Sequence, residues 1–183
     1  MRSLRTNWWW LALMIALLAA ASAQGGNAME LKSSAFTDGG KVPQQNVMPG
    51  AGGKNLSLPL QWSGAPAGTQ SFALSIVDPH PVARNWVHWL VINLPGNASG
   101  LEEGAAAKKM PPGAVELQNS WGKAGYGGPQ PPPGTGDHPY VVTLYALNVA
   151  KLDLKPSTDL AGFQKAMEGK VLGTAKITGY YGR

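Results

Sequence analysis

Residues 141–149 read VVTLYALNV, which is the clearest strand pattern in the chain. Residues 86–94 read WVHWLVINL and are apolar on both faces, as expected for a central strand of a β-sandwich. Two further stretches, 56–61 and 72–77, alternate between two sets of side chains with a period of two. Helical spacing occurs once, over residues 157–169. Several strands, one late helix and no strand–helix alternation predict a mainly β protein, an antiparallel sandwich with a short C-terminal helix.

Further residues predict where the strands and the helix begin and end. Residues 29–36 and 171–178 predict the first and last strands. Pro59 places its strand at a sheet edge, because proline cannot donate a hydrogen bond to a neighbouring strand. Ser157 is the expected N-cap of the helix, and Gly169 lies where a C-cap belongs.

The N-terminal segment has the pattern of a secretory signal peptide, predicted as residues 1–23. Arg2 and Arg5 precede an apolar run over residues 8–20, and a small-x-small cleavage motif ends at Ala23. The apolar run is shorter than the ~20 residues that a membrane-spanning helix needs. We therefore predict an exported protein, periplasmic or secreted, with one domain over residues 24–183 and no transmembrane segment in the mature form.

The charge and the amino-acid composition exclude several classes of function. Removing Arg2 and Arg5 from the 15 basic residues leaves 13 against 10 acidic ones, a net charge of +3. The lysines are scattered, so the sequence lacks the basic stripe of a nucleic-acid-binding protein. Cysteine is absent, which excludes a thiol nucleophile, a thiolate metal site and a lipid-modified cysteine.

One aspartate and the histidines are the candidates for chemistry. Asp78 closes one predicted strand and His88 lies in the next, so the two can approach near one end of a sheet if these strands are neighbours. His138 opens the long strand and shares a face with Tyr140, two residues on. Each has a structural alternative: a hydrogen-bonded core residue for His88, an exposed loop residue for His80, and a turn former for Asp78.

Residues 122–136 are almost all glycine and proline and predict a stiff rim beside this cluster. Its glycines, Gly127, Gly128, Gly134 and Gly136, would let backbone N–H groups approach an anion. A polyproline recognition segment is the alternative for this stretch. An iron site with two histidines and one carboxylate stays open as a weaker hypothesis, and we predict neither a metal nor a cofactor. The sequence contains no GxSxG motif of an α/β-hydrolase.

Two blocks of sequence resemble the phosphatidylethanolamine-binding protein family, in its bacterial Raf-kinase-inhibitor-like branch. The first block consists of Leu60-Gln61-Trp62, residues 66–74 (PAGTQSFAL), Val77-Asp78-Pro79 and residues 86–89 (WVHW). The second consists of residues 125–129 (GYGGP), Pro131-Pro132, Gly134 and His138-Pro139-Tyr140. Two features depart from the family pattern: His80 stands where an acidic residue is usual, and Pro139 replaces an arginine.

The resemblance implies a Greek-key β-sandwich with a small preformed pocket that accepts phosphate or phosphoethanolamine-like head groups. The residues it implies for ligand binding are Asp78, His88, His138, Trp86, Tyr140, Gly128 and Pro131. Two imidazoles could donate N–H groups to phosphate oxygens, so we expect affinity to rise as the pH falls through the histidine range. The implied function is a non-enzymatic binding protein. The alternatives are an inhibitor of a protease or kinase and, third, a hydrolase or metal enzyme that uses the Asp/His/His cluster.

Overall fold

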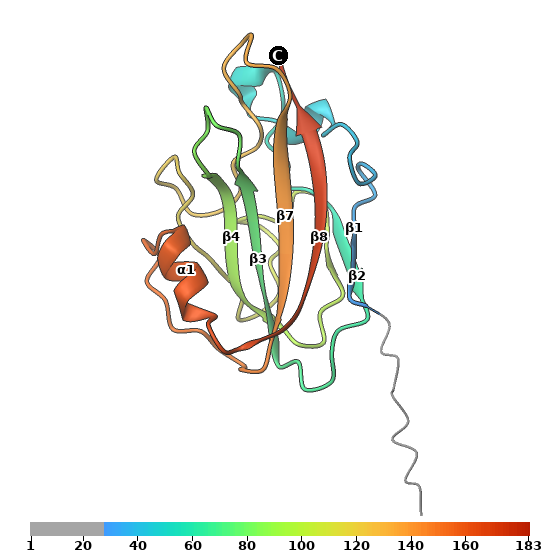
Figure 1. Cartoon of the computed structure of the whole chain (residues 1–183), viewed down its shortest axis with the longest axis vertical. Coiled ribbons are helices and arrows are strands. Elements are labelled where there is room, and N and C mark those ends of the chain that lie inside the picture. Colours follow the sequence, from blue (N-terminus) through green and yellow to red (C-terminus); the bar gives the residue numbers. More distant parts are fainter. Residues whose placement is uncertain (1–27) are drawn as a thin grey trace, which may run out of the picture.

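Two antiparallel sheets pack face to face in the computed structural model, which describes residues 28–183 (Figure 1). The larger sheet has the order β6 (Val115–Glu116), β4 (Trp86–Pro95), β3 (Ser71–Asp78), β7 (His138–Leu147) and β8 (Val171–Tyr181). The smaller sheet has the order β1 (Glu30–Lys32), β2 (Leu60–Ser63) and β5 (Gly100–Leu101). The predicted antiparallel sandwich is confirmed.

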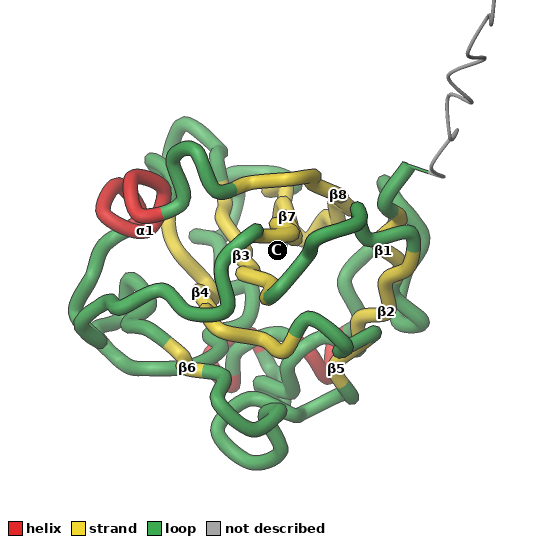
Figure 2. The backbone as a smooth tube through the Cα atoms, turned by 90° about the horizontal axis from the view of Figure 1, so that it is seen from below, coloured by secondary structure: helices red, strands yellow, loops and turns green. Residues whose placement is uncertain are grey.

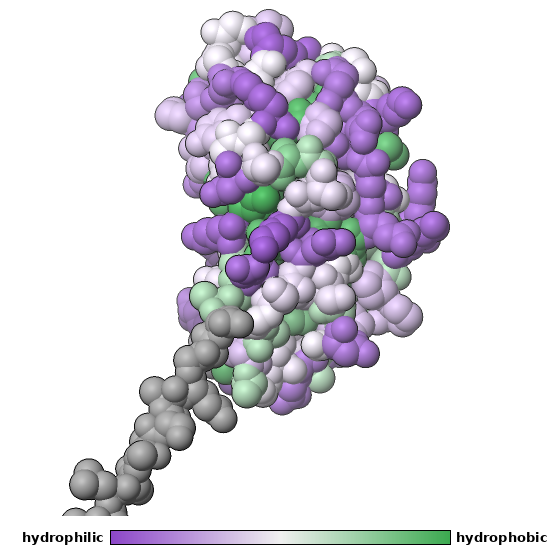
Figure 3. All heavy atoms as spheres, turned by 90° about the vertical axis from the view of Figure 1, so that its right-hand side faces the viewer, coloured by the Kyte–Doolittle hydropathy of each residue, from purple (hydrophilic) through white to green (hydrophobic). Residues whose placement is uncertain are grey.

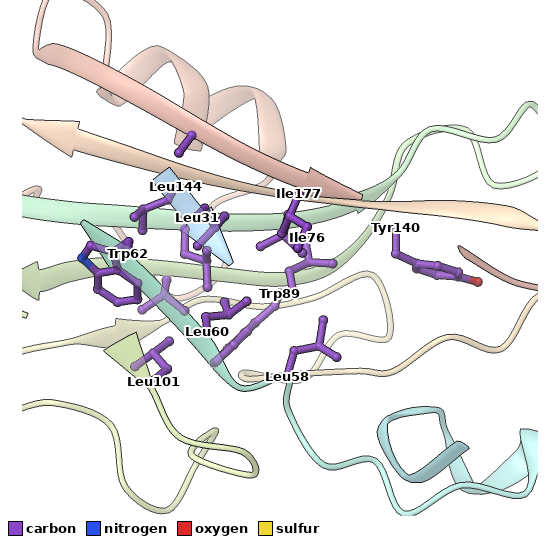
Figure 4. Packing of buried hydrophobic residues seen from close by; sticks show 14 of the residues in the cluster. Leu31, Leu58, Leu60, Trp62, Ile76, Trp89, Leu101, Tyr140, Leu144 and Ile177 are labelled. Atoms are coloured by element: carbon purple, nitrogen blue, oxygen red, sulfur yellow. The ribbon is translucent and has the colours of Figure 1, made fainter. Parts of the chain in front are cut away.

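Apolar side chains fill the space between the two sheets. The large side chains that are almost completely buried there include Leu58, Leu60, Phe72, Leu74, Ile76, Trp89, Leu94, Tyr140 and Leu144. Figure 4 shows Tyr140 beyond the leucines of this cluster, with its hydroxyl group directed away from them. The core therefore holds the ring of Tyr140, while its hydroxyl group points out of the core towards one end of the sandwich.

The one α-helix among residues 28–183, α1 (Leu160–Ala166), lies on the outer face of the larger sheet (Figure 2). Two short 3-10 helices, Gln44–Asn46 and Pro49–Ala51, lie in the segment before β2. Phe163 and Met167 bury their side chains there in a second apolar cluster with Leu147 and Leu152. A late helix was predicted, but its N-cap is Asp159, whose carboxylate accepts a hydrogen bond from the Gly162 N–H at 2.8 Å. The prediction of Ser157 as the cap was wrong.

The structure also corrects the prediction for the strand that contains Pro59. That strand covers Leu60–Ser63 and lies in the middle of the smaller sheet, between β1 and β5. Pro59 precedes the strand, so its missing N–H removes no hydrogen bond from the sheet. The two-residue strands β5 and β6 were not predicted, because a pattern with a period of two needs a longer run to be visible.

A hollow lies between β1 and β8, the edge strands of the two sheets. Apolar side chains, among them Leu31, Phe36 and Ile177, line it, and Lys32 and Lys176 border it. Figure 3 shows this side of the molecule, where apolar surface lies between polar side chains. The predicted signal peptide and its cleavage site near Ala23 lie outside the described residues. Within residues 28–183, no helix has the length and apolar character needed to cross a membrane.

Candidate functional site

A cavity of about 250 Å³ opens at the end of the larger sheet where β3 ends and β4 and β7 begin, the upper end in Figure 1. Antiparallel pairing brings these strand ends together, because Asp78 is the register partner of Trp86. The residues that line the cavity are Asp78, Val82, Ala83, Trp86, His88, Trp121, Gln130, Pro131, Pro132, His138 and Tyr140. Six of the seven residues expected to bind a ligand therefore share one cavity, and Gly128 is the exception.

Asp78 lies at the bottom of the site and is almost completely buried. Its Oδ1 accepts a hydrogen bond from the His80 backbone N–H at 2.8 Å, and its Oδ2 lies 2.6 Å from His138 Nδ1. A buried carboxylate without such partners would carry a large desolvation penalty. Asp78 is thus both a turn former, through His80, and the partner of a site histidine.

His138 uses both ring nitrogens in hydrogen bonds. Its Nε2 lies 2.9 Å from Thr135 Oγ1, and that hydroxyl also lies 2.8 Å from the Pro132 carbonyl oxygen. Its Nδ1 lies 2.6 Å from Asp78 Oδ2. Both ring nitrogens of His138 are therefore engaged within the protein, and neither is free for a ligand.

His88 is buried and uncharged. Its Nδ1 donates a hydrogen bond to the Gly127 carbonyl at 2.6 Å, so Nε2 of the neutral ring carries a lone pair. Burial lowers the pKa of His88 to about 4, although the Gly127 carbonyl and the Asp78 charge act in the opposite direction. At neutral pH this imidazole therefore has a hydrogen-bond acceptor, and no free N–H donor, to offer to the cavity.

The low pKa of His88 predicts a loss of stability in acid. An unfolded chain takes up a proton here near the ordinary pKa of 6.5, whereas the folded protein does so only near a pKa of about 4. Between these values the unfolded state binds more protons, so the free energy of unfolding decreases as the pH falls. We expect this group to contribute a decrease of about 3 kcal/mol over that window.

Urea denaturation at several pH values measures this effect, with His88→Asn as the comparison. The asparagine amide keeps a donor for Gly127 and does not titrate, so the variant should lack the His88 part of the slope. Asp78 and His138 are present in both proteins, and their contribution cancels in the difference. Identical slopes in the two proteins would contradict the assignment of a neutral, buried His88.

Aromatic rings form the walls of the cavity. Trp86 is 37% exposed, and its ring plane lies 80° from that of Trp121, with the ring centroids 5.3 Å apart. The rings of Trp121 and Tyr140 both contact His88 edge-on, with centroids at 5.2 and 4.9 Å. Burial raises the pKa of Tyr140 far above its usual range, so its hydroxyl keeps its proton and can donate it.

The Gly/Pro loop forms the remaining wall, but its amides are largely occupied. Gly127 N–H donates to the His88 carbonyl at 2.8 Å, Gly128 N–H to Asn55 Oδ1 at 2.7 Å, and Gly134 N–H to the Arg183 carbonyl at 2.9 Å. These three groups therefore support the loop and are not available to an anion. Gly128 packs behind the wall, where an added Cβ would lie 2.2 Å from the Asn46 carbonyl oxygen.

His80 lies behind the site, partly buried. Its ring stacks on that of His138, with centroids 3.8 Å apart, and its Nδ1 accepts from the Val82 N–H at 3.3 Å. The residue is therefore neither a free loop side chain nor part of the cavity lining. Its ring packs against one face of the His138 ring and helps to hold that ring in place.

Sequence reasoning missed Trp121, because it lies in a stretch without a regular pattern. Its backbone N–H donates to Asn119 Oδ1 at 2.9 Å, and its ring packs on Gly127, where an added Cβ would be 2.5 Å from the ring. A tryptophan beside Gly122 in an otherwise polar segment was the only clue. The side chain of Gln130 at the cavity was missed as well.

The positions of the histidine and carboxylate side chains test the hypothesis of an iron site. Within residues 28–183, no group of three or more His, Asp or Glu side chains is placed so that it could share a metal ion. The Nδ1 atoms of His88 and His138 point to Gly127 and Asp78. The arrangement therefore gives the iron hypothesis no support.

Comparison with known proteins agrees with this architecture. The sequence profile described as phosphatidylethanolamine-binding protein matches residues 32–182. A UPF0098 protein of Methanothermobacter thermautotrophicus is 42% identical over 156 residues, which cover 85% of this chain and 99% of that protein. Lipoprotein LppC of Mycobacterium tuberculosis is 37% identical over 164 residues, covering 89% and 77% of the two chains.

Two solved structures are similar in sequence and in fold. Escherichia coli YbcL, described as a new member of the mammalian PEBP family, has a TM-score of 0.80 at 33% identity and covers 85% of this chain and 98% of its own. The homologue CT736 from Chlamydia trachomatis has a TM-score of 0.75 at 34% identity, with 86% and 99% covered. This chain therefore belongs to the phosphatidylethanolamine-binding protein family.

Proposed function

We propose that this protein is a non-enzymatic binding protein whose cavity takes a small phosphoethanolamine-like head group. The observation that carries the proposal is the convergence of Asp78, His88, His138 and Tyr140 on one preformed cavity with aromatic and proline walls. A mostly apolar cavity with a few convergent polar groups is the usual form of a small-molecule site. Export through the N-terminal segment, as predicted from the sequence, is part of the same proposal.

The phosphate group of the ligand would bind to the free hydrogen-bond donors of the cavity. The Tyr140 hydroxyl is a donor that the described residues leave without a hydrogen-bond partner. His138 Nε2 is a second group that could contact the phosphate, with a proton on that nitrogen, if Thr135 moves aside. Thr135 lies between Gly134 and Gly136, which both have positive φ angles, in an exposed turn that can adjust. Charged phosphate oxygens form stronger hydrogen bonds than a hydroxyl does, which favours this exchange.

An enzymatic role is less favoured. Thr135, His138 and Asp78 form a hydrogen-bonded series, but Thr135 does not line the cavity, and its hydroxyl also hydrogen-bonds to the Pro132 carbonyl. A nucleophile has to donate its proton to the base and reach the substrate. The series therefore supports a role in holding His138, which favours the binding function that we propose.

Titration calorimetry with O-phosphoethanolamine tests the proposal. Tyr140→Phe should weaken binding about tenfold, because it removes a hydrogen bond to a charged group. Tyr145→Phe is the matched control, since Tyr145 lies against the second apolar cluster near α1 and should change nothing. No heat of binding to the parent protein, or equal affinities for the two variants, would contradict the proposal.

The pH dependence of anion binding gives a further test. Sulfate is a suitable probe, because its charge stays constant from neutral pH to pH 4. Protonation of His88 adds an Nε2–H donor, so affinity should rise only as the pH approaches the His88 pKa of about 4. This is lower than the histidine range expected from the sequence. A rise centred near pH 6.5 would show that His88 is not the group responsible.

A further inference from the structure

The mouth of the cavity contains a rigid aromatic corner formed by Trp86 and Trp121. The two rings contact each other edge to face, with planes 80° apart, so a group placed in the angle that they form meets the face of at least one indole. Val87 N–H donates to Ser120 Oγ at 2.9 Å and joins the chain segments beside the two tryptophans, and Gly127 leaves the space that the Trp121 ring occupies. The corner therefore exists without a ligand, and binding there would not have to order it.

The charges around this corner disfavour a simple anion. Among residues 28–183, no lysine or arginine lines the cavity. His88 presents a lone pair, both ring nitrogens of His138 are engaged, and the side chain of Asp78 is buried beside His138. The cavity thus offers no free cationic side chain, while its aromatic faces carry the negative part of their quadrupoles.

We propose that the Trp86–Trp121 corner binds the ammonium end of the ligand, and that it prefers a quaternary ammonium such as choline to a primary one. Indole faces attract cations but offer no hydrogen-bond acceptor. A quaternary ammonium has no N–H group to satisfy and is weakly hydrated, whereas a primary ammonium would give up three hydrogen bonds to water. The inference rests on the proposed function and names the ligand class for this site.

Binding of choline and of its neutral isostere 3,3-dimethylbutan-1-ol to the whole protein tests the charge preference. The two molecules have the same shape, so the difference between them isolates the positive charge. Choline should bind about tenfold more tightly, a difference of the size that cation–π contacts produce. Equal affinities would overturn the inference, because the corner would then be only an apolar slot.

Two substitutions of Trp121 test whether choline binds at this corner. Trp121→Leu should reduce choline affinity about tenfold, while Trp121→Phe should retain most of it, since phenylalanine keeps an aromatic face. Circular dichroism checks that both variants are folded. Equal losses in the two variants would place the ammonium elsewhere.

Phosphate esters separate this inference from the proposed function. Phosphocholine should bind more tightly than O-phosphoethanolamine to the parent protein, and Trp121→Leu should remove the difference. Binding of O-phosphoethanolamine without any gain for phosphocholine would overturn the inference and leave the proposed function standing. Binding of choline with no affinity for either ester would instead overturn the proposed function.

Cosedimentation with phosphatidylcholine vesicles, compared with binding of soluble phosphocholine, distinguishes a lipid-borne head group from a free one. Binding of either one supports the ammonium site.

Discussion

Asp78→Asn is expected to abolish binding of O-phosphoethanolamine and to lower the free energy of unfolding by about 3 kcal/mol. The carboxylate accepts hydrogen bonds from the His80 backbone and from His138 in a buried place. An uncharged amide takes the carboxylate away from His138 Nδ1, and removing one partner of a buried, hydrogen-bonded pair is strongly destabilising. Urea denaturation followed by tryptophan fluorescence measures the change in stability, and calorimetry measures the change in affinity.

Asp137→Asn is the matched control for this prediction. Asp137 forms an ion pair with Lys41, but both side chains are exposed, so its loss should cost less than about 1 kcal/mol. Comparable effects of the two substitutions would show that the Asp78–His138 pair has no special role. A folded Asp78→Asn protein with unchanged affinity would remove Asp78 from the binding site.

Gly128→Ala is expected to have a similar effect on stability through sterics alone. An added Cβ would lie 2.2 Å from the Asn46 carbonyl oxygen and 2.9 Å from the Val47 backbone. Because both contacts are backbone atoms, the loop has to move, and the hydrogen bond from Gly128 N–H to Asn55 would be strained. We expect a loss of about 3 kcal/mol and a weaker ligand site, since overpacking of a tight position costs this much. Thermal unfolding measures the loss.

Gly134→Ala gives the comparison within the same loop. Gly134 has a φ of +79°, but an added Cβ there would meet nothing within 4 Å. Its substitution carries only conformational strain, about 1 kcal/mol. If both variants lost the same amount, the close packing of Gly128 against Asn46 would not be what holds this wall in place.

The sequence was informative about the strands and about which polar residues meet. The apolar run that becomes β4 and the Asp-Pro end of β3 are local features, and antiparallel pairing of neighbouring strands brings Asp78 and His88 together. The opening of β7 at His138 adds the third residue. These features depend on periodicity and on the position of prolines, which sequence alone displays.

The hydrogen-bond roles of the same residues could not be predicted. His88 accepts at neutral pH because the Gly127 carbonyl, 39 residues away in sequence, holds its Nδ1–H. His138 has no free ring nitrogen because Thr135 reaches it through a turn. Both facts arise from tertiary packing, which the sequence does not display.

The position of Trp121 depends on packing of the same kind. Its ring occupies space that exists only because residue 127 is a glycine, and the two are joined by irregular chain. No periodicity marks such a contact. Pro59 shows the opposite case: the local rule about proline was sound, but the strand begins at Leu60, one residue after Pro59, and not at residue 56.

A crystal structure of the protein grown with O-phosphoethanolamine tests the central claim most directly. We predict density for the ligand in the cavity, with its phosphate within hydrogen-bond distance of the Tyr140 hydroxyl and its ammonium end beside Trp86 and Trp121. Thr135 should have moved away from His138 Nε2. An empty cavity at saturating ligand, or a ligand bound only elsewhere on the protein, would contradict the assignment of this cavity as the binding site.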